Sequence, residues 1–357
     1  MLKKGNPIQW NSLKVMMDHN EEREKDPHWE VCQHNIVNFL LDVCNLDFTA
    51  EEINHVIGVI EVNAFEVSLG PSGQTGRGVF PLLAKLNHGC VSNCRYINVE
   101  EGRVMECRAT VVVRAGEEVR DHYVSPLQST VRRREGLKVG WYFSCECERC
   151  GDSSESGTDL SSFSCSGLRE REDRWGTSSP CPGVVRAVNS LQADTDYHCH
   201  NCPNIFSSNL VTGLREEVEE MLAMTDKSDV MGLEFLLEMY GKSLHRSNST
   251  VLTIKRHLIY IYGRSAEYCD EERLAKKIEF CEDILAACDV LMPGLTKERG
   301  LTLYELIMAT VQAQVKQPED LLDLLKEAEK CLQFERKGTF EFVILSKVRL
   351  MLQYLDV

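Results

Sequence analysis

The sequence predicts an α+β protein in which a zinc-stabilised β core is preceded by a helical segment and followed by an all-α C-terminal domain. Apolar residues recur at helical spacing in residues 1–65 and again in residues 208–357. Residues 66–144 instead contain short alternating segments separated by glycine turns. Clustered cysteines in residues 145–207 indicate bound metal, and these four ranges are the expected domains.

Composition narrows the class of protein. The length of 357 residues is enough for two or three domains, and the 43% hydrophobic and 27% charged content is typical of a water-soluble globular protein. The sequence contains neither an apolar run long enough to span a membrane nor a secretory signal, so we expect an intracellular protein of the cytoplasm, the nucleus or both. A net charge of −15 disfavours direct nucleic-acid binding and favours protein partners.

Two helices are expected before the β core. Residues 28–44 form the first, with Asp26 as its cap. Its apolar residues share one face at helical spacing: Val31, Ile36, Phe39, Leu40 and Val43. Thr49 and Glu52 form a capping box that begins the second helix, which runs to Asn63.

Residues 67–123 are predicted to be antiparallel β. Met105, Cys107 and Ala109 alternate with polar residues on one strand, and residues 70–78 (GPSGQTGRG) are expected to form a flexible connection. Ser125 is the expected cap of the next helix, with Pro126 at its first position. The run Arg132 to Arg134 on that helix is interpreted as a solvated face, with a binding patch as the alternative.

The C-terminal region is expected to form an array of antiparallel helical pairs, because short connections separate its segments. Asn, Gly and Pro residues mark their ends. The seven predicted helices span residues 210–224, 230–246, 250–262, 271–292, 297–316, 319–336 and 340–355. Before them, residues 166–180 are interpreted as an exposed insertion.

Cysteine spacing predicts a first zinc site. Cys145, Cys147 and Cys150 supply three thiolates, and Cys90 is the candidate for the fourth that a tetrahedral zinc needs. Closing a loop of about 55 residues costs roughly 3.5 kcal/mol. A structural zinc contributes on the order of 10 kcal/mol, so binding is favoured over reduced cysteines without metal.

A second zinc site is predicted from Cys165, Cys181, Cys199 and Cys202, with loose surface thiols as the alternative. His198 or His200 could replace one thiolate at this site. The other cysteines are expected to pack as small apolar residues, and this set comprises Cys32, Cys44, Cys94, Cys107, Cys269, Cys281, Cys288 and Cys331.

Six short motifs resemble a SET domain of the SMYD family, and more closely the arthropod SmydA group. They are NAF (residues 63–65), LNHGCVSNC (86–94), RAGEEV (114–119), HYVSP (122–126), GWYF (140–143) and CECERC (145–150). The resemblance implies a SET-type β core with a helical insert in residues 1–65. It also implies a post-SET zinc region in residues 145–207 and a TPR-like helical-pair domain at the C-terminus.

The resemblance further implies an S-adenosylmethionine-dependent protein-lysine methyltransferase that acts on a lysine-bearing protein. The implied cofactor contacts are Asn63, Asn87, His88, Tyr123 and Phe143. Tyr123 would be the catalytic residue, with a strand-end core tyrosine as the alternative, and Phe65 and Trp141 would line the lysine channel. Cys90, Cys145, Cys147 and Cys150 would bind the post-SET zinc, and the C-terminal helices would contact further proteins.

The sequence also departs from the family pattern. By resemblance, we expect the chain to start inside the helical insert, without the glycine-rich strand and the MYND zinc module, and we do not expect residues 73–78 (GQTGRG) to replace that strand. Gly89 and Ser92 stand where the motif usually has serine and proline, and Trp141 stands where many relatives have tyrosine. The alternative function is therefore a non-catalytic, zinc-stabilised scaffold for protein interaction or transcriptional regulation.

Overall fold

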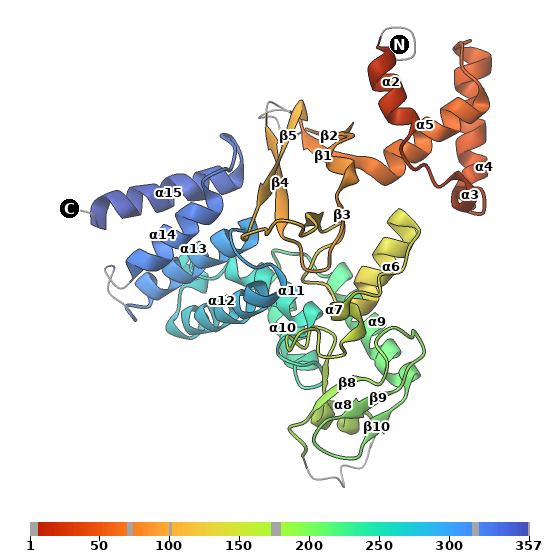
Figure 1. Cartoon of the computed structure of the whole chain (residues 1–357). Helices are drawn as coiled ribbons and strands as arrows, with labels where there is room; N and C mark the ends of the chain where they lie inside the picture. Colours follow the sequence, from red (N-terminus) through yellow and green to blue (C-terminus); the bar gives the residue numbers. More distant parts are fainter. Residues whose placement is uncertain (1–5, 70–73, 100–101, 173–179, 316–320, 356–357) are drawn as a thin grey trace.

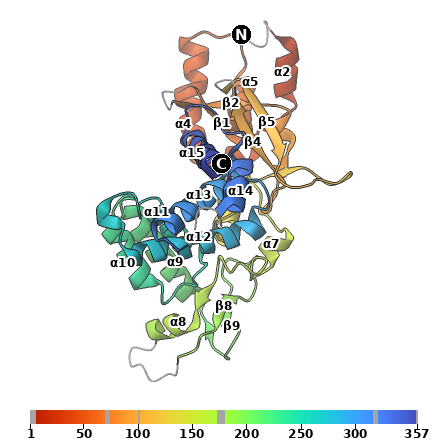
Figure 2. The same ribbon diagram turned by 90° about the vertical axis from the view of Figure 1, so that its left-hand side faces the viewer.

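The computed structural model describes residues 6–69, 74–99, 102–172, 180–315 and 321–355 of the chain. In both views the N-terminal helices lie at one end of the molecule and the cysteine-rich strands at the other (Figures 1 and 2). The strands β1 (Ala64–Ser68), β2 (Thr75–Val79), β4 (Cys94–Val99) and β5 (Val104–Ala109) lie next to the N-terminal helices, and the C-terminal helices flank the middle (Figure 1).

The N-terminal region is helical. Its elements are α2 (Pro7–Lys14), α3 (Asn20–Arg23), α4 (His28–Cys32), the π-helical turns η1 (Gln33–Val37) and η2 (Phe39–Val43), and α5 (Ala50–Asn63). The predicted capping box is confirmed, because Thr49 accepts the backbone N–H of Glu52 at 3.1 Å and the Glu52 carboxylate accepts that of Thr49 at 3.1 Å. Asp26 accepts the backbone N–H of His28 at 2.8 Å, as expected of a cap.

The apolar face predicted for residues 28–44 is wrong. Its members Val31, Phe39 and Val43 are about half or more exposed, whereas Val37, outside the predicted set, is 1% exposed. The physical reason is the local geometry. A π-turn holds more residues than an α-turn, so positions chosen at a spacing of 3.6 residues spread around the helix.

The β region consists of three two-stranded ladders. Their strands are β1 (Ala64–Ser68) with β2 (Thr75–Val79), β4 (Cys94–Val99) with β5 (Val104–Ala109), and β3 (Asn87–His88) with β6 (Arg120–Asp121). The first two ladders are antiparallel, as predicted. The third is parallel, which corrects the expectation of a purely antiparallel region. Part of the expected flexible connection is also ordered as β2, and residues 70–73 lie outside the described residues.

The exposed side of the β4–β5 ladder also differs from the prediction. Cys107 and Ala109 are exposed, while the polar face carries Arg95 and Arg108, which are directly paired across the strands. Arg95 donates to the Cys331 carbonyl at 2.9 Å, and the Arg108 guanidinium lies 3.9 Å from the centre of the Phe334 ring. The alternation was read correctly, but the C-terminal helices cover the arginine face.

A second contact fixes the β region to the C-terminal helices. The backbone N–H of Leu295 donates to the Thr110 carbonyl at 2.9 Å. Gly294, at φ +82°, is the residue that permits this approach, because a Cβ there would lie 2.0 Å from the same oxygen. A larger residue at this turn would therefore separate the two regions.

Helix α6 (Thr130–Trp141) begins later than predicted. Its cap is Ser129, whose hydroxyl accepts the Arg132 backbone N–H at 3.5 Å, and residues 125–128 form a turn instead. Two short helices of the cysteine-rich region follow α6, namely α7 (Glu148–Gly151) and α8 (Cys165–Glu172). The expectation of an exposed insertion over residues 166–180 is wrong for its first half, which forms helix α8 and contains the fully buried Leu168. Residues 173–179 lie outside the described residues.

The cysteine-rich region also contains a four-stranded antiparallel sheet in the order β10-β9-β8-β7. The strands are β7 (Phe163–Ser164), β8 (Val184–Ala187), β9 (Tyr197–Cys199) and β10 (Ile205–Phe206). A single hydrophobic core continues from this sheet into the first C-terminal helices, from Leu160 to Leu291.

All seven predicted C-terminal helices are present, with ends shifted by a few residues. They are α9 (Ser208–Met224), α10 (Val230–Tyr240), α11 (Ser249–Ile259), α12 (Glu271–Leu291), α13 (Lys297–Gln312), α14 (Leu322–Leu332) and α15 (Phe340–Leu355). The last three share a second hydrophobic core. Cys281, Cys288 and Cys331 are buried as expected, whereas Cys44 and Cys107 are exposed. Among the helices of the described residues, none has the length and apolar character needed to cross a membrane.

Candidate active site and cysteine clusters

A cavity of about 760 Å³ lies where the N-terminal helices, the β region and the end of α6 meet. Six of the residues that the SET resemblance singled out line it: Asn63, Phe65, Asn87, Tyr123, Trp141 and Phe143. They come from positions up to 80 residues apart, so the fold gathers one set of motifs around one space. Thr75, Gly76 and Arg77 line it too, although residues 73–78 were not expected to take part.

The parallel pairing of β3 with β6 positions Tyr123. It aligns Asn87 with Arg120 and His88 with Asp121, so the chain leaves β6 beside the end of β3. The Tyr123 hydroxyl donates to the Leu86 carbonyl at 2.5 Å. Because that bond uses the hydroxyl proton, the oxygen lone pairs remain available as acceptors towards the cavity.

The amide side chains and aromatic rings of the cavity wall are held by their own contacts. Asn87 donates to Glu118 at 2.6 Å and Asn63 donates to the Met17 carbonyl at 2.8 Å. The Trp141 and Tyr123 rings lie 5.0 Å apart, and the Phe65 ring meets the Tyr96 ring edge-on at 5.1 Å. These contacts limit side-chain motion around the space that a ligand would fill.

A second cavity of about 730 Å³ adjoins the first. It extends from the β region to the C-terminal helices, where Arg256, Lys297 and Glu335 line it. Five residues line both cavities: Glu66, Tyr96, Asp121, His122 and Tyr123. A ligand in the first cavity and a chain segment in the second could therefore meet at Tyr123.

Asp121 is the residue at this junction that the sequence analysis missed. It is 3% exposed, and burial raises the pKa of its carboxyl to about 6. Burial also lowers the pKa of His122 to about 4 and raises that of Tyr123, an effect that Asp121 adds to. Tyr123 and His122 are therefore neutral at pH 7. The one signal in the sequence was the position of Asp121 two residues before Tyr123.

The first cysteine cluster lies beneath this site. The sulfur atoms of Cys90, Cys145, Cys147 and Cys150 all lie within 4.8 Å of one another, with Cys90 at 3.5 Å from Cys150 and 3.9 Å from Cys145. Tetrahedral zinc with Zn–S bonds of about 2.3 Å needs sulfurs about 3.8 Å apart. The four thiols thus fit one zinc ion. The predicted loop of about 55 residues between Cys90 and Cys145 does bring its two ends together.

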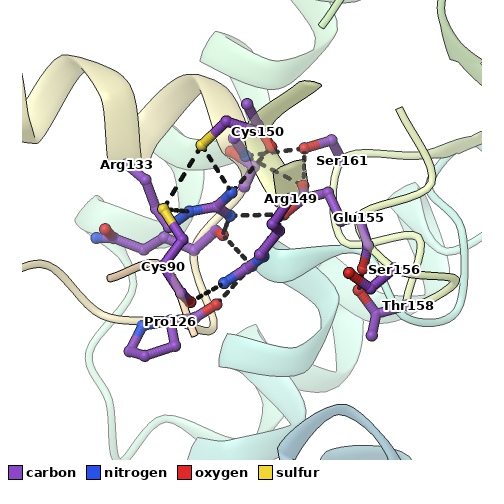
Figure 3. Close-up of polar contacts among 12 residues, drawn as sticks. Cys90, Pro126, Arg133, Arg149, Cys150, Glu155, Ser156, Thr158 and Ser161 are labelled. Atoms are coloured by element: carbon purple, nitrogen blue, oxygen red, sulfur yellow. Dashed lines mark hydrogen bonds and ion pairs between the residues drawn. The ribbon is translucent and has the colours of Figure 1, made fainter. Parts of the chain in front are cut away.

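Two buried arginines surround this cluster (Figure 3). Arg133 is fully buried and donates to Cys90 Sγ at 3.4 Å and to Cys150 Sγ at 3.5 Å. Arg149 donates to the Cys90 carbonyl at 2.8 Å. Both arginines pair with Glu155, at 2.5 and 2.9 Å. The interpretation of Arg132 to Arg134 as a solvated face is therefore wrong for Arg133. Four thiolates carry excess negative charge, and this charge stabilises the buried Arg133 guanidinium. A run of arginines in the sequence does not reveal that such a cluster lies next to one of them.

Electrostatics explain why these charges stay ionised although they are buried. Burial alone would lower the pKa of Arg133, but Glu155 and the sulfurs of Cys90 and Cys150 raise it. Burial would raise the pKa of Glu155, but Arg133 and Arg149 lower it overall. The cluster, the two guanidinium groups and the carboxylate therefore form one mutually dependent unit.

His88 connects that unit to the candidate active site. The Tyr123 backbone N–H donates to His88 Nδ1 at 3.1 Å, and His88 Nε2 lies 3.2 Å from Cys90 Sγ. Because a backbone amide can only donate, a neutral His88 carries its proton on Nε2 and directs it at the sulfur. His88 is absent from the cavity lining, so the structure places it as a link between Cys90 and Tyr123.

The second cluster joins Cys165, Cys181, Cys199 and Cys202, whose sulfur atoms also lie within 4.8 Å of one another. Gly183 is required beside it, because a Cβ there would lie 2.3 Å from Cys199 Sγ. His198 and His200 pack on each other, with ring centres 4.5 Å apart, and neither belongs to the cluster. Four thiols again match the preference of structural zinc.

Glu155→Gln is expected to destabilise the fold by about 3–5 kcal/mol, because two buried guanidinium groups lose their shared carboxylate and only the cysteine cluster remains to balance them. Zinc content should fall with it. The matched control is Glu219→Gln, whose carboxylate pairs with Arg132 but is 25% exposed, and this change should cost less than about 1 kcal/mol. Denaturant unfolding measures both, and equal effects of the two variants would contradict the role assigned to Glu155.

The chain is similar to SET domain-containing proteins and to lysine methyltransferases. No family model matches the chain. It is 27% identical over 270 residues to the SET domain-containing protein SmydA-8, isoform A, of Drosophila melanogaster, an alignment that covers 73% of this chain and 54% of that protein. It is 36% identical to the histone-lysine N-methyltransferase Smyd1 of Mus musculus over 29% of this chain and 24% of that protein. It is 32% identical to the N-lysine methyltransferase SMYD2-B of Xenopus laevis over 41% of this chain and 30% of that protein.

The relatives that the chain resembles are SET-domain proteins. More particularly, the chain is similar to SMYD-family SET proteins, the SmydA group of Drosophila among them. The alignments to SmydA-8 span about half the length (54%) of those relatives.

Proposed function

We propose that this chain carries the active site of an S-adenosylmethionine-dependent protein-lysine methyltransferase. The observation that carries the proposal is the junction of the two cavities at Tyr123. Two cavities that have a few lining residues in common suit a reaction in which a group passes from a cofactor in one cavity to a macromolecule in the other. Relatives named as lysine methyltransferases support the same reaction class.

The first cavity suits the cofactor. Its volume of about 760 Å³ is within the range of cofactor sites, and its wall combines aromatic rings with a few fixed polar groups. Asn63, Asn87 and Phe143 would hold the cofactor there, and His88 would act by fixing the Tyr123 backbone. When bound, S-adenosylmethionine supplies a methyl group on a sulfonium.

The chain's own contribution is alignment and control of the lysine charge. The aromatic residues Phe65, Tyr96 and Trp141 exclude water from the space next to Tyr123, and a dry environment disfavours the charged ammonium. The Tyr123 oxygen can accept an N–H of the neutral amine and orient its lone pair, since the hydroxyl proton is bonded to Leu86. An in-line displacement gains most of its acceleration from such positioning.

In this proposal the two clusters hold one zinc ion each and the substrate is a protein that enters through the second cavity. The C-terminal helices form a TPR-like helical-pair domain that contacts further proteins. The protein works inside the cell, in the cytoplasm, the nucleus or both.

A methyl-transfer assay tests the proposal. The purified chain is incubated with methyl-labelled S-adenosylmethionine and, separately, with core histones and with a cell lysate as acceptors. We expect label on lysine side chains, located by mass spectrometry, and about 10²- to 10³-fold slower labelling when Tyr123 is replaced by phenylalanine. Absence of label from every acceptor, with zinc bound, would favour the second candidate.

That second candidate is a non-catalytic, zinc-stabilised interaction protein. Exposed apolar side chains on α4 and η2 favour it, because Val31, Phe39 and Val43 are each about half or more exposed there. Under this candidate the chain would bind about two zinc ions but would neither bind S-adenosylmethionine nor transfer its methyl group.

A further inference from the structure

Asp121 differs from every other buried carboxylate of the described residues. The others each have a cationic partner: Glu155 has Arg133 and Arg149, Asp159 has Arg186, Asp283 has Arg246 and Lys255, and Glu305 has Arg264 and Lys277. Within the same part of the chain, no Lys or Arg pairs with Asp121, and its Oδ1 atom lacks a hydrogen-bond partner.

Neither nitrogen of His122 neutralises Asp121: the backbone N–H that donates to the carboxylate carries no charge, and the ring is neutral as well. His122 Nδ1 lies 3.6 Å from Asp121 Oδ1, beyond hydrogen-bond range, and is 3.1 Å from the Ser92 hydroxyl instead. Burial lowers the pKa of His122 to about 4, so the ring is neutral at pH 7. Tyr96 and Tyr123 also stay neutral, since burial and then Asp121 raise the pKa of both phenols.

A buried carboxylate that has no cationic partner and one oxygen without a hydrogen bond is costly, and proteins rarely keep one unless a ligand completes it. The position of Asp121 shows where that ligand would come from. Asp121 lines both cavities, as do Tyr96 and Tyr123. The missing cation must therefore enter through one of the two cavities.

We propose that Asp121 receives the ammonium group of the substrate lysine as it passes from the second cavity towards Tyr123. This inference rests on the proposed function. The compact ammonium of lysine fits a single carboxylate oxygen, whereas the flat guanidinium of arginine is best matched by two. Asp121 is thus a substrate-binding residue that selects lysine at the junction. The ammonium then gives up one proton to water in the second cavity, and the neutral amine moves on to the Tyr123 oxygen.

Asp121→Asn tests this role, because it keeps the shape of the side chain and removes its charge. In the full chain we expect the KM for a lysine acceptor to rise by about 10- to 100-fold, the loss typical of a hydrogen bond to a charged group. The Kd of S-adenosylmethionine should stay within about threefold. The melting temperature should be unchanged or higher, since a functional residue that is unfavourable for folding is being removed.

Asp283→Asn is the matched control, because Asp283 is equally buried but paired. It should lower the melting temperature by leaving Lys255 without a counter-charge, and it should leave the KM for lysine unchanged. A drop in melting temperature for Asp121→Asn as well would show a structural role. Weaker binding of S-adenosylmethionine with an unchanged lysine KM would show that Asp121 serves the cofactor. Either result overturns the inference.

A binding measurement separates this inference from the proposed function. Calorimetric titration with n-butylammonium, with n-butanol as the neutral control, probes the cation site without any methyl transfer. We expect the unaltered chain to bind n-butylammonium and Asp121→Asn to lose that binding. If the chain transfers no methyl group but binds the cation through Asp121, the proposed function fails and the site stands. If n-butylammonium binds both forms equally, or neither, the site is contradicted whatever the activity.

Discussion

Cys147→Ser is expected to remove one zinc ion per chain and to lower the melting temperature strongly. Cys147 is one of four thiols that lie within 4.8 Å of one another, and three ligands do not close a tetrahedral site. A structural zinc contributes on the order of 10 kcal/mol to the folded state. Its loss also leaves Arg133 and Arg149 beside uncharged thiols, so the damage should extend to α6 and the cavity wall.

Metal analysis and thermal unfolding measure this effect. Cys44→Ser is the control, since Cys44 is an exposed thiol outside both clusters, and it should change neither the zinc content nor the melting temperature. Affinity for S-adenosylmethionine should fall with Cys147→Ser as well, because Phe143 lines the cavity only two residues before Cys145. Full zinc content in Cys147→Ser would show that this cluster does not bind the metal.

Tyr123→Phe is expected to reduce methyl transfer by about 10²- to 10³-fold, as loss of one fixed dipole at a reacting group typically does. The variant removes the oxygen that orients the amine and the bond to the Leu86 carbonyl, but it keeps the ring contact with Trp141. Zinc content and cofactor affinity should therefore stay close to those of the unaltered chain.

Tyr354→Phe makes the same chemical change at a tyrosine that is 75% exposed on α15, and it should not alter transfer. Rates under saturating cofactor separate the two variants. If Tyr123→Phe transferred methyl groups as fast as Tyr354→Phe, Tyr123 would be a core tyrosine at the end of a strand and not the catalytic residue.

Features that depend on local sequence were predictable. The seven C-terminal helices follow from apolar spacing and from Asn, Gly and Pro punctuation, and the Thr49–Glu52 capping box follows from two side chains three residues apart. The two cysteine clusters also follow from sequence, because thiolates with metal-ligand spacing have few other uses in a reducing compartment.

Features that depend on tertiary contacts were not predictable from one sequence. The β3–β6 pairing joins two segments of two residues each, too short to show any alternation, yet it determines where Tyr123 lies. The sequence around Arg133 is typical of an exposed helix face. Arg133 is nevertheless buried, because Cys90 and Glu155, which are distant in sequence, contact its guanidinium group in the folded chain. Asp121 is informative only because no Lys or Arg of the described residues pairs with it and its Oδ1 atom lacks a hydrogen bond, and such partners are visible only in the folded chain.

Calorimetric titration of S-adenosylmethionine into the purified chain tests the central claim most directly, because it needs no knowledge of the protein substrate. The site described above predicts binding of one cofactor molecule per chain, weakened when Asn87 or Phe143 is replaced by alanine and little changed in Tyr123→Phe. Absence of any binding heat from a folded chain that holds its zinc would contradict the assignment of the first cavity to the cofactor, and with it methyl transfer by this chain.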